Sequence, residues 1–384
     1  MKTARIRAKR VFVALLGNER TQSFSVALFT IFLSLLVGAI LLLSLGNNPL
    51  LAYKSILQGA GFLPKIRYAG YRNIFTDFMN LLNYLTPMVF ASLAVAIAFK
   101  SGLFNICVSG MMVFSGFVAT LLVGYSTLPP LIARPLVLLV GVGCGALLGA
   151  LIGYLKYRFN TNEVVSSIML NYIISYTVSF FIQTRFVDPV TRQSVKINES
   201  SRLILSDALV GNLKMNISLV LPLAILLIIL LQFLLSRSRL GFELKAVGLN
   251  ARASRYAGIQ IGRTVITAMV LSGSLAGLAG VSYYLGTFAS IQPKVLPPLG
   301  FDAIAVALLG NSSPVGCLFA SLLVTTITNG TTYMSSTLGV LREIASVITG
   351  ILLLFSACSE FVRVLVRKYR LELEQINEEV LAHV

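Results

Sequence analysis

The stretch TVITAMVLSGSLAGLAGVSYYL, residues 264–285, holds 22 residues without a charged side chain. A helix needs about 20 predominantly apolar residues to cross the hydrocarbon core of a bilayer. Residues 24–45 and 215–236 are uncharged over the same length, and residues 135–155 are uncharged over 21 positions. Stretches of this length and composition predict membrane-spanning helices, and they decide the fold class.

The composition of the whole chain agrees with this prediction. Of its 384 residues, 56% are apolar and 12% are charged, and the mean hydropathy is +0.85. Soluble domains have about 45–50% apolar and about 25% charged residues. We therefore predict an all-α polytopic integral membrane protein with about ten transmembrane helices. The predicted spans are residues 24–45, 84–99, 103–124, 135–155, 163–182, 215–236, 264–285, 300–311, 314–330 and 342–359.

Ten spans place both termini on the same side of the membrane. If that side is the cytoplasm, 19 of the 31 Lys and Arg residues lie inside and 12 lie outside, as the positive-inside rule favours. The expected organisation is a basic cytoplasmic N-tail (1–23), a transmembrane domain (24–359) and a cytoplasmic C-tail (360–384). Within the transmembrane domain, 46–83 and 183–214 are outer segments and 237–263 is a cytoplasmic loop.

Several function classes are excluded by what the sequence lacks. The one His is in the tail, and the four Cys form no C-x-x-C pair, so metal catalysis and a disulfide scaffold are not expected. The net charge of +17 comes from bases between apolar runs, which indicates membrane orientation and not nucleic-acid binding. The chain has no Walker A pattern, zinc motif or nucleophile elbow. We therefore expect no cofactor and no enzymatic site in this chain.

Two segments of the chain resemble each other. Residues 93–102, LAVAIAFKSG, and residues 304–313, IAVALLGNSS, each run through small and apolar residues to a polar break. Breaks at corresponding places in two halves indicate a duplicated transporter with discontinuous helices. The alternative is that Ala and Gly only permit close helix packing. The glycines within 141–145 and at Gly273, Gly277 and Gly280 are interpreted as packing residues.

The cytoplasmic loop 237–263 predicts a short helix. Asn250 is a suitable N-cap and Gly258 a suitable C′ residue for a helix of about two turns. A helix this short is marginal in water by itself, so it fits a segment that docks on another protein. A basic loop held by anionic lipid head groups explains the same composition.

The same loop carries a resemblance to a known family. Residues 241–259, GFELKAVGLNARASRYAGI, resemble the coupling segment of bacterial ABC importer permeases of the ribose, branched-chain amino acid and nucleoside group. The family pattern is similar to G-x-x-L-R-A-V-G-x-N-x-x-A-A-x-Y-A-G-I. This chain has Lys245 in place of Arg and Ser254 in place of Ala.

Two further stretches are similar to the same family. Residues 101–106, SGLFNI, resemble a motif that continues with Gly and Glu, where this chain has Cys107 and Ser109. Residues 162–165, NEVV, and 169–173, MLNYI, resemble the nucleoside-type members most closely. The match extends over roughly residues 84–350.

The resemblance implies a subunit of an ATP-driven importer in the bacterial cytoplasmic membrane. Its implied partners are an ABC ATPase subunit that binds ATP and Mg, a second and different permease subunit, and an extracytoplasmic substrate-binding lipoprotein. The implied ATPase-coupling residues are Gly241, Lys245, Gly248, Asn250, Arg252, Ala253, Arg255, Tyr256, Ala257 and Gly258.

Polar and aromatic side chains at the helix breaks and span ends are the candidates for the substrate pathway. A stacking ring and an amide suit a nucleoside, which has a flat base and a hydroxyl-rich ribose. The candidates are Phe104, Asn105, Ser109, Glu163, Asn171, Asp302, Asn311 and Ser312. Packing is the alternative role for each of them, and a helix N-terminal charge is the alternative for Glu163 and Asp302.

Other functions remain open at this point. The cargo could be a sugar or a branched-chain amino acid. A secondary transporter driven by an ion gradient is less favoured, because no span carries a titratable residue at its middle. A structural or assembly protein of the membrane would carry no solute, and a membrane enzyme would need a catalytic constellation that the sequence lacks.

Overall fold

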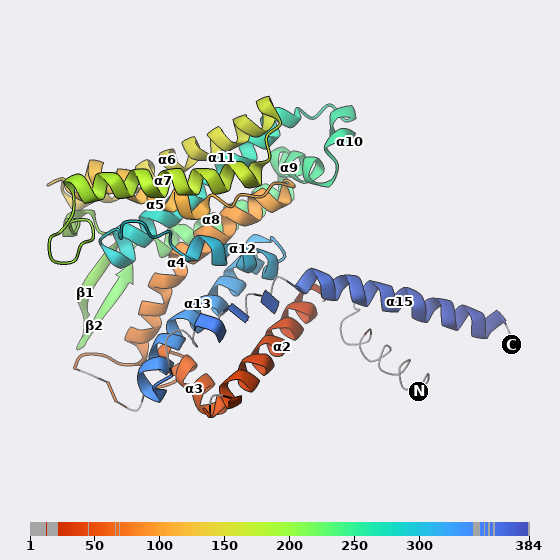
Figure 1. Ribbon diagram of the computed structural model, residues 1–384, viewed down its shortest axis with the longest axis horizontal. Helices are drawn as coiled ribbons and strands as arrows, with labels where there is room; N and C mark the ends of the chain where they lie inside the picture. Colours follow the sequence, from red (N-terminus) through yellow and green to blue (C-terminus); the bar gives the residue numbers. More distant parts are fainter. Residues whose placement is uncertain are drawn as a thin grey trace. The chain divides into compact units, whose positions relative to one another are not determined.

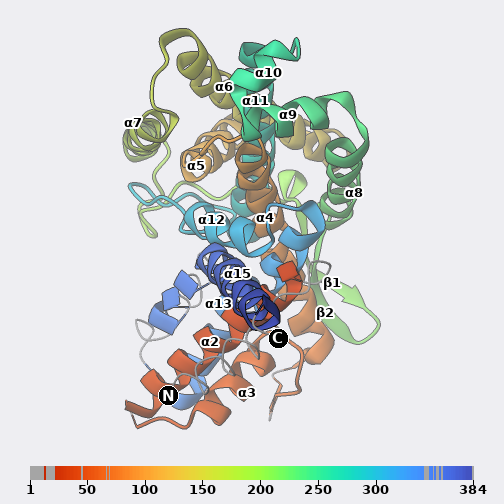
Figure 2. The same cartoon turned by 90° about the vertical axis from the view of Figure 1, so that its right-hand side faces the viewer.

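The computed structural model describes residues 13, 22–44, 46–65, 67–68, 70–340, 346–348, 350–351, 354–355 and 358–382. They fall into two compact units, which we describe separately: Tyr53–Val340, and Met1–Ala52 together with Leu341–Val384. Figures 1 and 2 show the chain in two views.

The larger unit is helical apart from one small sheet. Its elements are the end of α3 (Pro49–Gly59), α4 (Ile74–Lys100), α5 (Val108–Ala119), the π-helix η1 (Thr120–Gly124), α6 (Pro130–Phe159), α7 (Glu163–Arg185), the 3₁₀ turn η2 (Glu199–Ser201), β1 (Ile204–Val210), β2 (Leu213–Ser218), α8 (Leu221–Arg237), α9 (Arg239–Leu249), α10 (Ala251–Tyr256), α11 (Ile261–Val281), the π-helix η3 (Ser282–Phe288), α12 (Leu299–Leu309) and α13 (Pro314–Leu338).

The helices confirm the predicted fold class. Among the described residues, five helices are long and apolar enough to cross a membrane, or up to seven if each bent helix pair forms one span. The five are α4, α6, α7, α11 continued by η3, and α13. The predicted spans 103–124 and 300–311 correspond to the shorter apolar helices α5 with η1, and α12. The total of about ten remains a prediction.

The tightest packing joins α6 to α11. A methyl group added at Gly145 would overlap the Gly273 carbonyl oxygen, and one added at Gly277 would overlap the Gly141 carbonyl oxygen. The two backbones are therefore in direct contact, as small residues allow in membrane bundles. This confirms the predicted packing role of these glycines, whereas Gly143 of the same stretch has no atom within 4 Å of an added Cβ.

A β-hairpin replaces part of a predicted span. β1 and β2 pair antiparallel, with Ile204 opposite Ser218 and Val210 opposite Leu213, so the predicted span 215–236 is wrong at its start and α8 begins only at Leu221. Polar Lys214, Asn216 and Ser218 alternate with Met215 and Ile217, which is a strand period. The two residues between the strands, Gly211 and Asn212, are a hairpin-turn signal that our sequence analysis missed.

Helix α4 is longer than the predicted span 84–99. Its N-cap is Asn73, whose side-chain oxygen accepts hydrogen bonds from Phe75 N and Thr76 N, and the Thr76 hydroxyl oxygen accepts one from Asn73 N. This reciprocal capping box starts the helix at Ile74, inside the segment predicted as the outer loop 46–83. Pro87 lies within the helix, where it cannot donate the usual backbone hydrogen bond.

The smaller unit contains two long helices, α2 (Gln22–Ser44) and α15 (Ser359–Ala382). They contact each other through Val26, Val362 and Val366, with Phe29 packed against these three. Helix α2 matches the predicted span 24–45 within two residues. The predicted N-tail 1–23 lies outside the described residues except for positions 13, 22 and 23, and so do the first residues of the predicted span 342–359 and the single His.

The larger unit has two distinct ends. Helices α9 and α10 lie at one end, and the β1–β2 hairpin lies at the other, in both views (Figures 1 and 2). Helices α4 and α11 connect them, because α4 contacts both β2 and α9, while α11 follows α10 and continues into η3. We refer to them as the α10 end and the hairpin end.

Candidate functional site

Helix α10 at the α10 end has the two caps that the sequence predicts. The Asn250 side-chain oxygen accepts a hydrogen bond from Ala253 N at 3.1 Å, and Gly258 follows the helix with φ +78°. Because L-residues with a Cβ rarely adopt this conformation, glycine suits this position. The helix is short, Ala251–Tyr256, and only Ser254 of its residues is buried.

The candidate coupling residues fall on two surfaces. Those on or after α10 are exposed, and the Tyr256 side chain is 94% exposed. The exposed set is Asn250, Arg252, Ala253, Arg255, Tyr256, Ala257 and Gly258. Gly241, Lys245 and Gly248 lie on α9. Gly241 is buried and the other two are half-buried.

Helix α9 rests on the first helix break. A methyl group added at Gly248 would overlap the Lys100 carbonyl oxygen and would lie 2.9 Å from Gly102 N. Gly102 itself has φ +69° and directs its own open side toward Gly248. The backbone of α9 is thus in contact with the residues that end α4, and nothing larger than glycine fits at Gly248 without displacement.

The first break, between α4 and α5, is held by buried polar side chains. Asn105 is 1% exposed; its side-chain nitrogen donates to Ser272 Oγ on α11 at 2.8 Å, and its oxygen accepts from Cys107 N at 3.0 Å. Ser272 Oγ in turn donates to the Ala94 carbonyl oxygen at 2.7 Å. Phe104 is different, because it is 48% exposed and its ring packs on that of Phe99 at 4.8 Å.

Asn171 completes the N-terminus of α5 from another helix. Its side-chain oxygen accepts from Gly110 N at 2.8 Å, and its nitrogen donates to the Ile106 carbonyl oxygen at 2.9 Å. Helix α5 has no side-chain cap of its own, so α7 supplies an acceptor for one of the free N–H groups. Ser109 Oγ donates to the Pro297 carbonyl oxygen at 2.9 Å. The structure therefore brings Asn105, Ser109 and Asn171 together around α5.

Three further candidates, Glu163, Asn311 and Ser312, lie at helix ends. Glu163 begins α7 and pairs with Lys156 Nζ at 2.6 Å, which matches the alternative of a helix N-terminal charge. Asn311 and Ser312 form the second break, between α12 and α13, with φ +53° and +50°. Ser313 then caps α13 by accepting from Gly316 N at 3.0 Å. Both predicted breaks are present in the structure.

Asp302, in the first turn of α12, lies beside an aromatic cluster that our sequence analysis missed. Tyr84 of α4 and Tyr283 and Phe288 of η3 form the cluster, and the Tyr283 hydroxyl interacts electrostatically with Tyr84 and Asp302. The residues come from three separate stretches of sequence, so no local pattern joins them. The tyrosine pair at 283–284, at the end of the predicted span 264–285, was the available sequence signal for this cluster.

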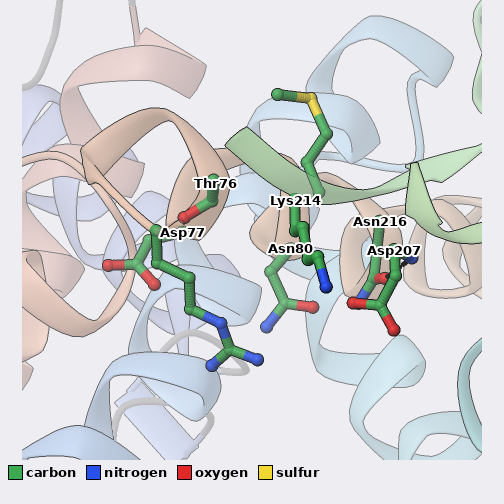
Figure 3. Close-up of a pocket in the computed structure, with 8 residues that line it drawn as sticks. Thr76, Asp77, Asn80, Asp207, Lys214 and Asn216 are labelled. Carbon is green, nitrogen blue, oxygen red and sulfur yellow. Dashed lines mark hydrogen bonds between the residues drawn. The ribbon is translucent and has the colours of Figure 1, made fainter. Parts of the chain in front are cut away.

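A polar pocket of about 70 Å³ opens at the hairpin end, between α4 and the hairpin (Figure 3). Thr76, Asp77 and Asn80 of α4 lie on one side, and Asp207, Lys214 and Asn216 of the hairpin lie on the other. Arg72 and Met215 complete the lining. Asp77 forms an ion pair with Lys65 at 2.8 Å. The sequence analysis placed Thr76, Asp77, Asn80, Asp207 and Lys214 in outer segments and Met215 and Asn216 in the span 215–236, and it gave no reason to pair these residues.

These features define a polytopic membrane permease. It has long apolar helices, two helix breaks, and a short exposed helix that lies between α9, which packs on the first break, and the span α11. The chain belongs to the family of branched-chain amino acid transport system permease components, whose model matches residues 78–357. It is therefore a multi-pass membrane transport subunit of the ABC permease class.

Individual relatives cover almost the whole chain. It is 35% identical to the nucleoside ABC transporter permease protein NupB of Lactococcus lactis, over 91% of this chain and 95% of the relative. It is 33% identical to the guanosine ABC transporter permease protein NupP of Bacillus subtilis, over 92% and 98%. A glucose ABC transporter permease protein of Haloferax volcanii, TsgB13, is 25% identical over 88% of each chain.

Proposed function

We propose that this chain is the permease subunit of an ATP-driven importer of nucleosides, and that α10 binds the ATPase on the cytoplasmic side. The observation that carries this proposal is the connection of α10. On one side it follows α9, which is packed through Gly248 on the end of α4, and on the other side it leads into α11. An exposed six-residue helix is marginal alone and suits a docking element.

The same connections support a mechanism. Helix α4 has 27 residues and is about 40 Å long, so a movement of α9 at its end acts on a rod that reaches the hairpin end. Helix α11 forms a second rod from α10 to η3. ATP-driven movement of α10 would therefore displace both sides of the aromatic cluster together and alternate the access to it.

The partners follow from the class of protein. We propose that a separate ATPase supplies the ATP and Mg sites, that a second, different permease completes the pathway, and that an extracytoplasmic lipoprotein delivers the substrate. In this orientation both termini are cytoplasmic and the hairpin end faces outward. The polar pocket between α4 and the hairpin then lies where the substrate arrives. Phe104, with its half-exposed ring, remains a pathway candidate at the other end.

Nucleosides are the cargo that the comparisons support best. The relatives at 35% and 33% identity carry nucleoside and guanosine in their names, whereas the glucose permease is 25% identical. A sugar or a branched-chain amino acid is the second candidate. An ion-gradient carrier is the third, and it would make Asp302 or Glu163 the coupling residue.

The docking role of α10 is tested in the assembled transporter, co-expressed with its ATPase and second permease. We expect Ala253→Trp to reduce co-purification of the ATPase at least tenfold while the permease stays in the membrane. Asn212→Trp adds the same bulk in the exposed hairpin turn and should leave co-purification unchanged. If both variants retain the ATPase equally, α10 is not the docking element.

The cargo is tested by uptake of labelled guanosine, glucose and leucine into cells with and without the gene. We expect loss of nucleoside uptake only, in a form that requires ATP and survives an uncoupler. Loss of glucose or leucine uptake would assign the second candidate. Uptake that collapses with the uncoupler at constant ATP would contradict the importer and favour the gradient-driven carrier.

A further inference from the structure

An aromatic cluster of half-buried rings lies toward the hairpin end. The Phe288 ring lies 4.6 Å from that of Tyr283 and 6.4 Å from that of Tyr84, measured between centroids, with interplanar angles of 42° and 75°. Phe288 is 47% exposed, and the two tyrosines are partly exposed. Two tyrosine rings in different orientations beside the accessible Phe288 ring offer both a stacking and an edge contact to a flat ligand.

Polar groups without protein partners surround these rings. Within the described part of the chain, the hydroxyls of Tyr84 and Tyr283 and the carboxylate of Asp302 make no hydrogen bond, although they are close enough to interact electrostatically. The hydroxyls of Ser282 and Thr287, on the same π-helix, are buried and also have no partner there. Buried polar groups are nearly always hydrogen-bonded, so the Ser282 and Thr287 hydroxyls are available to water or to a ligand.

The hairpin and the residue before it are hydrogen-bonded to both helices that carry the aromatic rings. On α4, Asn83 donates to the Asn216 carbonyl oxygen at 2.9 Å and Thr86 Oγ lies 3.4 Å from Ser218 Oγ, on either side of Tyr84. On η3, the Leu285 carbonyl oxygen accepts from Leu203 N at 3.0 Å. The π-helical turn itself is a rare conformation that occurs often at functional sites.

We infer that Tyr84, Tyr283, Phe288 and Asp302 form the contact site for a nucleoside on its way through the permease. The rings stack on the base, and the carboxylate accepts hydrogen bonds from the ribose hydroxyls, which are donors. The choice of a nucleoside as the ligand rests on the proposed function. It also predicts a selectivity, because the Asp302 carboxylate repels a phosphate group: a nucleoside passes and its 5′-monophosphate does not.

The test uses the complete transporter in proteoliposomes, with guanosine, 2′-deoxyguanosine and guanosine 5′-monophosphate as probes. We expect Phe288→Leu to raise the KM for guanosine at least tenfold with little change in ATPase co-purification. Phe181→Leu removes an equally exposed ring from α7 and should transport like the wild type. Tyr84→Phe keeps the ring and removes the hydroxyl, so it should have a smaller effect than Tyr84→Leu.

Asp302→Asn keeps the size of the side chain and removes its charge, so it tests the ribose contact without changing the packing. We expect the wild type to prefer guanosine over 2′-deoxyguanosine and this variant to lose that preference. Wild-type transport of guanosine combined with unchanged KM values for Phe288→Leu and Asp302→Asn would overturn the site and leave the proposed function standing. Absence of guanosine transport in the wild type, with glucose carried instead, would overturn the proposed function itself.

Discussion

Two regions of the larger unit, the first helix break and the aromatic cluster, satisfy their polar groups in opposite ways. At the α10 end, the break after α4 is fully bonded: both side-chain amides of Asn105 and Asn171 have partners, and Gly248 touches backbone atoms of the break. Toward the hairpin end, the hydroxyls of Tyr84 and Tyr283 and the Asp302 carboxylate have no partner among the described residues.

Under the proposed function, this difference corresponds to two kinds of role within one bundle. A site that must transmit displacement benefits from close packing and complete hydrogen bonding, because both make it rigid. A site that must bind and release a ligand keeps polar groups available for that ligand. The helices between the ends, α4 and α11, are well buried, and the proposed function assigns to them the transmission of movement.

The largest expected effect comes from separating α11 from α6. Gly145→Val places a side chain against the Gly273 carbonyl oxygen, so α6 and α11 must separate. We expect loss of the folded transporter, measured as the monodisperse fraction in size-exclusion chromatography of detergent extracts. Gly143→Val, two residues away on the same helix, has open space at its Cβ and should remain folded. Equal behaviour of the two variants would contradict backbone contact between α6 and α11.

A smaller change at the α10 end should uncouple transport from ATP hydrolysis. Gly248→Ala pushes α9 away from the Lys100 carbonyl oxygen, and we expect uptake per ATP hydrolysed to fall about tenfold in a folded, ATPase-bound transporter. The same substitution at the other end, Gly286→Ala, meets only Ile204 at 3.6 Å and should be tolerated. If uptake per ATP hydrolysed stays at the wild-type level in Gly248→Ala, α9 does not transmit the movement.

Removing one buried amide should weaken the break without abolishing the fold. Asn171→Ala leaves the Gly110 N–H and the Ile106 carbonyl without their partner, which costs about 1–3 kcal/mol for a buried group. We expect a lower thermal unfolding midpoint of the purified protein. Asn198→Ala loses a single exposed bond to the Ser126 carbonyl oxygen, so its midpoint should stay near that of the wild type.

The smallest effect is expected for the ion pair of Lys156 and Glu163. The two side chains are 31% and 13% exposed, and pairs near the surface contribute about 0–1 kcal/mol. Lys156→Gln should therefore change the unfolding midpoint little and leave uptake intact. If uptake instead collapsed, Glu163 would return as a candidate coupling residue.

Local patterns predicted much of this molecule. Asn250 and Gly258 bound a short helix as expected, the breaks near 101 and 311 are present, and Gly145 and Gly273 lie in a helix contact. Each of these features depends on neighbours within a few residues or on a residue's size alone. The hairpin was also signalled locally, by Gly211 and Asn212 and by the alternation of β2, but the strong hydropathy of the following helix obscured it.

The sequence by itself determined a multi-pass helical permease with a short capped helix in the loop 237–263. Hydropathy, charge bias and caps depend on short stretches of sequence. In a bilayer, an apolar segment must form a helix because its backbone N–H and C=O groups find hydrogen-bond partners only within the protein. Only the tertiary structure decided which polar residues are bonded and which are available. Asn105 and Asp302 look alike as candidates in the sequence, yet Ser272, 167 positions away, bonds the first, whereas the second interacts electrostatically with Tyr283 and makes no hydrogen bond within the described chain. Such partnerships arise from packing between distant segments.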